Sequence, residues 1–213
     1  MKKFTLVFSL LFITGTAFSQ ISVALGGNYT MYKGDFQKST PGAQIRVGYA
    51  ASERIRTELG FTYGFPITQA SSVLVADGIG NTVDVDSEIK YKFKTISLLA
   101  NYNFIGDEET SASLYGQFGA SFVLVNYKED ITGSYDKNVY TNPLNQIGKT
   151  NESGFTINLG LGGEYRFGTP AVFAEAGIAL PANQVGNTYV ENVIPSHFVF
   201  NLGVRISFGG GYN

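Results

Sequence analysis

The chain has 213 residues, a formal charge of −2 at neutral pH and no cysteine, and 44% of its residues are hydrophobic. This length suits one large β domain or two small ones. The nearly balanced, scattered charges disfavour a nucleic-acid partner, and the lack of cysteine excludes disulfides, zinc–thiolate sites and lipid attachment through an amino-terminal cysteine.

Residues 1–19 have the parts of a secretory signal peptide. Lys2 and Lys3 precede the apolar run 4–13, and the segment ends in Ala17-Phe18-Ser19. The run has about half of the ~20 apolar residues that a membrane-spanning helix needs. We therefore expect cleavage after Ser19 and an exported domain over residues 20–213. No later stretch is apolar for long enough to predict a spanning helix.

Three segments in which apolar and polar residues alternate come next, at residues 22–32, 43–51 and 54–65. Alternation is typical of β-strands, because a strand points successive side chains to opposite faces. The apolar side chains share one face of each segment. The opposite face of the second and third segments carries the charged residues Arg46, Arg56 and Glu58.

The fourth segment, residues 88–104, changes phase in its middle. Its apolar residues stand at odd positions from 89 to 93 and at even positions from 96 to 104. Such a slip near Lys94 and Thr95 predicts a β-bulge, which inserts one extra residue into a strand. The alternative is a regular strand that runs out past the buried band.

Four further segments complete the chain, at residues 113–127, 154–167, 171–180 and 198–208. Both faces of the first become apolar toward its end, whereas the other three alternate clearly. Their polar faces carry Glu164, Arg166, Glu175 and Arg205. A face with such charges is not the core of a soluble protein. Either the apolar face packs on a core and the polar face meets water, or the apolar face meets lipid and the polar face lines a barrel.

The connections between the segments alternate in length. Those after the second, fourth and sixth segments are short. The others are long and polar, at residues 33–42, 66–87, 128–153 and 181–196. This pattern predicts an all-β fold, an eight-stranded antiparallel up-and-down transmembrane β-barrel with short periplasmic turns and longer extracellular loops. Eight strands leave room only for side chains, so we expect a filled polar lumen.

Seven charged residues are expected to face this lumen. Because an unpaired buried charge is strongly unfavourable, the simplest interpretation is a mutually compensating ion-pair network. An alternative is a gate in a narrow conduit. The seven residues are Arg46, Arg56, Glu58, Glu164, Arg166, Glu175 and Arg205.

Catalytic and metal sites are not predicted. His197 is the only histidine, and it follows Ser196 directly, so the two side chains point to opposite faces of a strand and cannot act as nucleophile and base. We expect His197 to be an inward polar residue near the outer rim. The carboxylates in the loops lack a recognised metal-ligand spacing. We therefore predict no enzyme activity, no cofactor and no metal.

The whole exported domain resembles the small outer-membrane β-barrel proteins of the OmpA and OmpX type, the "outer membrane protein beta-barrel domain" or porin family. In the last segment, Asn201, Gly203, Ile206 and Phe208 resemble the signal by which the barrel-assembly machinery recognises its clients. The tail 209–213 departs from the family, in which many members end on the aromatic residue. The resemblance implies the outer membrane of a diderm bacterium, with membrane lipid and that machinery as partners.

The sequence thus predicts a non-enzymatic integral outer-membrane barrel whose outer loops have a structural or adhesive role or contact a surface or envelope protein. The resemblance leaves open a component of an outer-membrane secretion or assembly system, or a narrow channel. A further alternative is a secreted soluble barrel of the lipocalin type, which would bind an apolar ligand inside.

Overall fold

The computed structural model describes residues 20–33, 39–107, 110–144, 148–185 and 196–208. The predicted signal peptide and the tail 209–213 lie outside the described residues, and the cleavage after Ser19 stays a prediction. Among the described residues, no helix is long and apolar enough to span a membrane.

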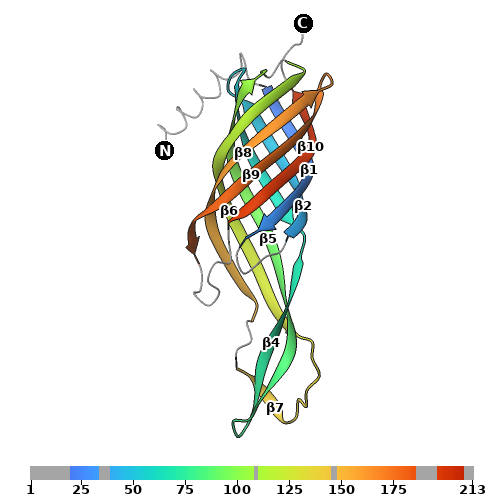
Figure 1. The fold of residues 1–213 in the computed structure, drawn as a ribbon, viewed down its shortest axis with the longest axis vertical. Coiled ribbons are helices and arrows are strands. Elements are labelled where there is room, and N and C mark those ends of the chain that lie inside the picture. Colours follow the sequence, from blue (N-terminus) through green and yellow to red (C-terminus); the bar gives the residue numbers. More distant parts are fainter. Residues whose placement is uncertain (1–19, 34–38, 108–109, 145–147, 186–195, 209–213) are drawn as a thin grey trace, which may run out of the picture.

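Eight antiparallel strands close into a barrel (Figure 1). Each pairs with the next around the ring, and β1 pairs with β10 from Ile21 opposite Phe208 to Tyr32 opposite His197. The ring therefore has no free edge, which satisfies the backbone hydrogen bonds of its strands in lipid. The predicted fold class is confirmed. The strands of the ring are β1 (Gln20–Tyr32), β2 (Ser39–Ala50), β3 (Ile55–Gly64), β5 (Thr82–Ile105), β6 (Ala112–Ile131), β8 (Thr150–Arg166), β9 (Pro170–Val185) and β10 (His197–Phe208).

In the lipid-facing part of the ring, most apolar side chains point outward, and the seven charged residues named from the sequence point inward. Leu98 and Leu202 are each 62% exposed on the outer wall, whereas Arg205 and Glu58 in the interior are each 1% exposed. A lipocalin-like barrel would have the opposite arrangement, with its apolar residues around an internal ligand. The facing is that of a barrel whose outer wall meets lipid.

Aromatic side chains are exposed at both ends of the apolar wall, as in the girdles of membrane barrels. The end with the short turns, here called the short-turn end, exposes Tyr49, Tyr102, Phe104, Tyr165, Phe167 and Phe208. The opposite end, here called the long-loop end, exposes Phe65, Phe155 and Phe198. The two sets mark the two boundaries of the lipid-facing band.

The bulge predicted near Lys94 and Thr95 is wrong. Strand β5 pairs with β6 in one register from Ser87 to Asn103, and the only shift lies between Asn103 and Ile105. Odd-numbered residues stay on the inner face from Val83 to Asn103. The apolar residues change parity because the surroundings change: toward the long-loop end the strand leaves the lipid, so its outer face meets water and its inner face packs against apolar neighbours.

Two further strands lie within the predicted loops 66–87 and 128–153, so the sheet has ten strands. Strand β4 (Ile67–Asp77) forms a hairpin with the outer part of β5, and β7 (Tyr140–Pro143) pairs with β4. Gly80, with φ 96°, allows the hairpin turn, where Asp77 accepts hydrogen bonds from the backbone of Ile79 and Asn81.

These added strands build a projection beyond the barrel, which we call the extension (Figure 1). It consists of residues 67–91, which hold β4 and the outer part of β5, and residues 128–144, which hold the end of β6 and β7. It has its own small core, in which three buried valines pack against partly buried neighbours. This core consists of Val73, Val75 and Val85, with Val83, Ile131, Tyr135 and Tyr140 around them.

Candidate functional site

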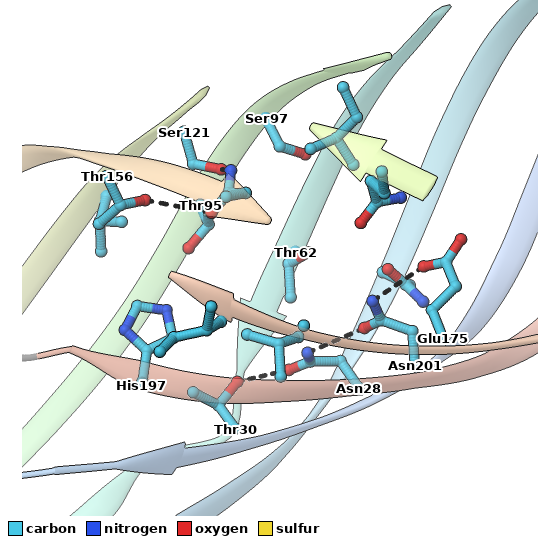
Figure 2. A pocket seen from close by; sticks show the side chains of 18 of the residues that line it. Asn28, Thr30, Thr62, Thr95, Ser97, Ser121, Thr156, Glu175, His197 and Asn201 are labelled. Atoms are coloured by element: carbon cyan, nitrogen blue, oxygen red, sulfur yellow. Dashed lines mark hydrogen bonds between the residues drawn. The ribbon is translucent and has the colours of Figure 1, made fainter. Parts of the chain in front are cut away.

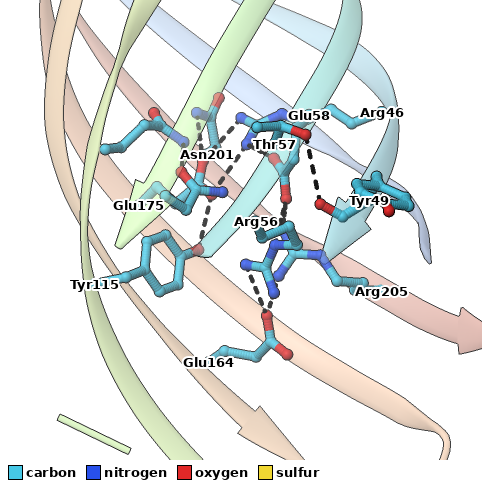
Figure 3. Close-up of polar contacts among 12 residues, drawn as sticks. Arg46, Tyr49, Arg56, Thr57, Glu58, Tyr115, Glu164, Glu175, Asn201 and Arg205 are labelled. Atoms are coloured by element: carbon cyan, nitrogen blue, oxygen red, sulfur yellow. Dashed lines mark hydrogen bonds and ion pairs between the residues drawn. The ribbon is translucent and has the colours of Figure 1, made fainter. Parts of the chain in front are cut away.

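The lumen contains two polar layers. A polar cavity lies toward the long-loop end (Figure 2), and a layer of charged side chains, here called the ionic layer, lies toward the short-turn end (Figure 3). The ionic layer brings together all seven charged residues named from the sequence, each with 7% exposure or less. They come from β2, β3, β8, β9 and β10, so only closure of the barrel makes them neighbours.

Glu58 is at the centre of the ionic layer. Its Oε1 accepts hydrogen bonds from Arg56 Nε at 2.9 Å and from Arg205 Nη2 at 2.6 Å, and its Oε2 accepts one from Arg46 Nη1 at 3.1 Å. Arg46 also binds both oxygens of Glu175, at 2.9 and 2.8 Å. A single carboxylate thus stabilises three buried guanidinium groups.

Glu164 makes the second hub. It accepts a hydrogen bond from Arg166 Nη2 at 2.7 Å and forms an ion pair with Arg205, and Arg56 Nη2 lies 3.4 Å from its Oε2. The layer holds four arginines and three glutamates, which gives it a formal charge of 4 − 3 = +1. Removal of any one carboxylate would therefore increase an existing excess of positive charge.

Three neutral residues that the sequence had not indicated complete the layer. Tyr115 donates a hydrogen bond to Glu175 at 2.8 Å, and Gln44 accepts hydrogen bonds from Arg46. The ring of Phe173 lies 4.9 Å from the guanidinium carbon of Arg205, a cation–π distance. The alternation along β6 and β9 puts Tyr115 and Phe173 on the inner face. It could not single them out, because apolar and aromatic residues occupy both faces of these two strands.

The residues of the suggested assembly signal are divided between the two faces of β10. Asn201 points into the lumen, where it donates to Glu175 at 3.0 Å and accepts from Asn28 at 3.1 Å. Gly203 faces inward against Phe173, since a Cβ there would lie 2.7 Å from the ring. Ile206 and Phe208 are exposed on the outer wall.

Gly162 on β8 leaves room for Tyr115. A Cβ at Gly162 would lie 2.5 Å from two ring carbons of Tyr115, whereas a Cβ at the outward-facing Gly116 would meet nothing within 4 Å. We expect Gly162→Val to lower the free energy of unfolding in detergent by about 1–3 kcal/mol through overpacking. Gly116→Val is the matched control and should not destabilise the barrel. Equal losses for the two variants would contradict this packing.

The cavity beside the ionic layer is lined mainly by neutral amide and hydroxyl side chains, several of which bond to one another, and it borders on Arg46 and Glu175 of that layer (Figure 2). Thr30 donates to Asn28 at 3.1 Å, and Asn158 donates to Ser121 at 2.6 Å. The cavity has a volume of about 80 Å³. Polar walls and this volume suit a small cluster of water molecules.

His197 lies at the outer side of this cavity, facing inward near the long-loop end as the sequence predicts. Its ring is 5.2 Å from that of Tyr32, which in turn stacks on Phe93 at 4.7 Å. Phe93 belongs to a buried apolar cluster that also contains Tyr91 and Tyr127. The polar lumen is thus followed by an aromatic layer on the way to the extension.

Comparison with known proteins agrees with this architecture. The model of the family described as "Outer membrane protein beta-barrel domain" matches residues 4–208. The crystal structure of a major outer membrane protein from Thermus thermophilus is similar, with a TM-score of 0.56 and 14% identity, over 89% of this chain and 99% of that one. No curated protein matches the chain.

The crystal structure of Ail from Yersinia pestis, in complex with the heparin analogue sucrose octasulfate, is also similar, with a TM-score of 0.52 and 14% identity. The match covers 90% of this chain and 99% of Ail. At these identities the likeness concerns the fold. With the family match over nearly its whole length, the chain belongs to the outer membrane protein beta-barrel domain family and is an outer-membrane protein.

Proposed function

We propose that this protein is a non-enzymatic barrel with a closed lumen that holds the extension outside the cell as a contact surface for a surface or envelope protein. The length of β5 carries the proposal. Its 24 residues span roughly 80 Å at about 3.3 Å per residue, whereas a strand crosses the bilayer in about 9–11 residues. About half of β5 therefore stands beyond the lipid.

The surface of the extension supports a protein partner. Leu74, Ile79, Val139 and Leu144 expose 41–88% of their surface. Leu144 donates its backbone N–H to Leu74, so these two residues are neighbours. On the lipid-facing wall, contact with lipid explains the exposed apolar side chains. On a projection into water, such side chains favour contact with another protein.

The ionic layer supports the closed lumen and a structural role for its seven residues. Each carboxylate is bound by at least one arginine, and the layer lies in a barrel of eight strands, whose interior its side chains fill. We also propose that Asn201, Gly203, Ile206 and Phe208 act as an assembly signal, which the outward position of Ile206 and Phe208 at the short-turn end supports.

Single cysteines test the orientation and the contact, because the chain contains no cysteine of its own. Ile79→Cys lies at the tip of the extension, and Glu53→Cys lies in an exposed short turn. We expect a membrane-impermeant maleimide to label Ile79→Cys on intact cells, and to label Glu53→Cys only after the outer membrane is permeabilised.

The same two variants, carrying a photo-activated crosslinker, test for a partner. We expect a crosslinked surface or envelope protein with Ile79→Cys on intact cells, and none with Glu53→Cys. If only Glu53→Cys were labelled on intact cells, the barrel would have the opposite orientation in the membrane. Labelling of Ile79→Cys without any crosslinked protein would contradict the contact function.

A further inference from the structure

The outer face of β5 changes character at one position. Ile96 and Leu98 are exposed on the apolar wall, at 46% and 62%. The next three outward residues toward the long-loop end are Lys94, Lys92 and Lys90, all exposed. Outward positions are about 6.6 Å apart along a strand. The first lysine therefore stands one such step beyond the last lipid-facing side chain of β5.

A fourth lysine joins this row from the neighbouring strand. Lys128 on β6 is directly opposite Lys90, and like charges in that relation repel each other. Asp130 offsets part of the repulsion, since it forms an ion pair with Lys128 and lies 3.8 Å from Lys90. Within the described part of the chain, neither Lys92 nor Lys94 has a carboxylate partner. We call these four residues the lysine row.

The lysine row is part of a wider separation of charge. The described arginines lie in the ionic layer, apart from Arg54 in a short turn. Every described lysine lies at the long-loop end or on the extension, beyond the lipid-facing wall. They are Lys33, Lys90, Lys92, Lys94, Lys128, Lys137 and Lys149. Flexible ammonium groups thus gather at one boundary of the membrane, and no described lysine lies at the other.

We propose that the lysine row binds the phosphate groups of anionic lipids in the outer leaflet. An acyl chain that lies along Ile96 and Leu98 brings its headgroup to the level of Lys94 and Lys92. There, a phosphate accepts hydrogen bonds from the ammonium groups and offsets their mutual repulsion. The lysine row continues directly from the apolar wall, which favours a lipid as the ligand. A soluble polyanion would gain nothing from that wall.

Native mass spectrometry of the folded protein in detergent tests this proposal, with bisphosphorylated lipid A as the probe. Basic residues near an anionic lipid surface each contribute to binding. We expect Lys94→Gln to weaken lipid A binding about fivefold and Lys92→Gln with Lys94→Gln about 25-fold. Lys137→Gln, far out on the extension beside Tyr135, is the matched control and should bind as the unchanged protein does.

Three comparisons decide the result. Lipid A without its phosphates should bind the unchanged protein as weakly as the double variant binds the intact lipid. Full binding of intact lipid A by the double variant would overturn the proposal. So would complete competition by a soluble sulfated saccharide at equal concentration, because the row would then be a site for soluble polyanions. A heat-modifiable shift in gel migration shows that each variant is folded.

Discussion

Replacement of Glu58 by glutamine is expected to lower the free energy of unfolding by about 3–5 kcal/mol, the usual cost of removing one partner from a buried ion pair. The carboxylate of Glu58 contacts Arg46, Arg56 and Arg205, all at most 4% exposed. Without it, the ionic layer goes from a formal charge of +1 to +2. Equilibrium unfolding in urea, with the barrel in lipid vesicles, measures the loss.

Two controls separate the lost charge from other effects of the substitution. Glu53→Gln changes a carboxylate in an exposed turn and should have little effect, since surface substitutions away from special features are nearly neutral. Glu58→Gln combined with Arg205→Met returns the layer to +1. The combined loss should be smaller than the sum of the two single losses. A loss for Glu58→Gln no greater than that for Glu53→Gln would contradict the network.

Replacement of Leu202 by arginine is expected to lower the free energy of unfolding by about 2–4 kcal/mol, because it places a charge on the lipid-facing wall. Leu202 is 62% exposed near the middle of β10, with Phe200 and Val204 as its outward neighbours. The measurement is again unfolding in vesicles. The effect should decrease toward the ends of the strand, where a long side chain can reach the interface.

Leu74→Arg provides the matched control for the lipid environment. Leu74 is also an exposed leucine on a strand, at 41%, but it lies on the extension. In water the same substitution should change stability by no more than about 0.5 kcal/mol. Equal losses at the two positions would mean that both leucines meet the same surroundings, and the placement of the membrane would be wrong.

The alternation of side chains was enough to predict the eight strands of the ring and the direction in which each points. Side chains of a strand alternate with a period of two, and β10 has an apolar residue at every second position. If lipid surrounds the barrel, these apolar residues must face outward and the residues between them inward. The same rule placed Arg46, Glu58, Glu164 and Arg205 in the interior. These predictions need only the local chain, and they do not depend on which strands are neighbours.

The extension was missed, although a signal was present. Val73 and Val75 precede the turn at Asp77–Asn81, and Val83 and Val85 follow it, which is the pattern of a hairpin. Serine, aspartate and glycine residues surround these valines, however, so the composition of residues 66–87 predicts a polar loop. The regular strand β5 shows a second limit of the local sequence. Its change of apolar parity predicts a bulge, because the local sequence does not distinguish a slip in register from a change of surroundings.

The local sequence thus determined the strands, their facing and the charges that the lumen must hold. The tertiary structure alone decided that Glu58 meets arginines from three strands, that Tyr115 and Phe173 join them, and that β5 continues beyond the membrane. The physical reason is that side-chain direction follows from the geometry of a single strand, whereas contacts between strands depend on the register and closure of the whole barrel.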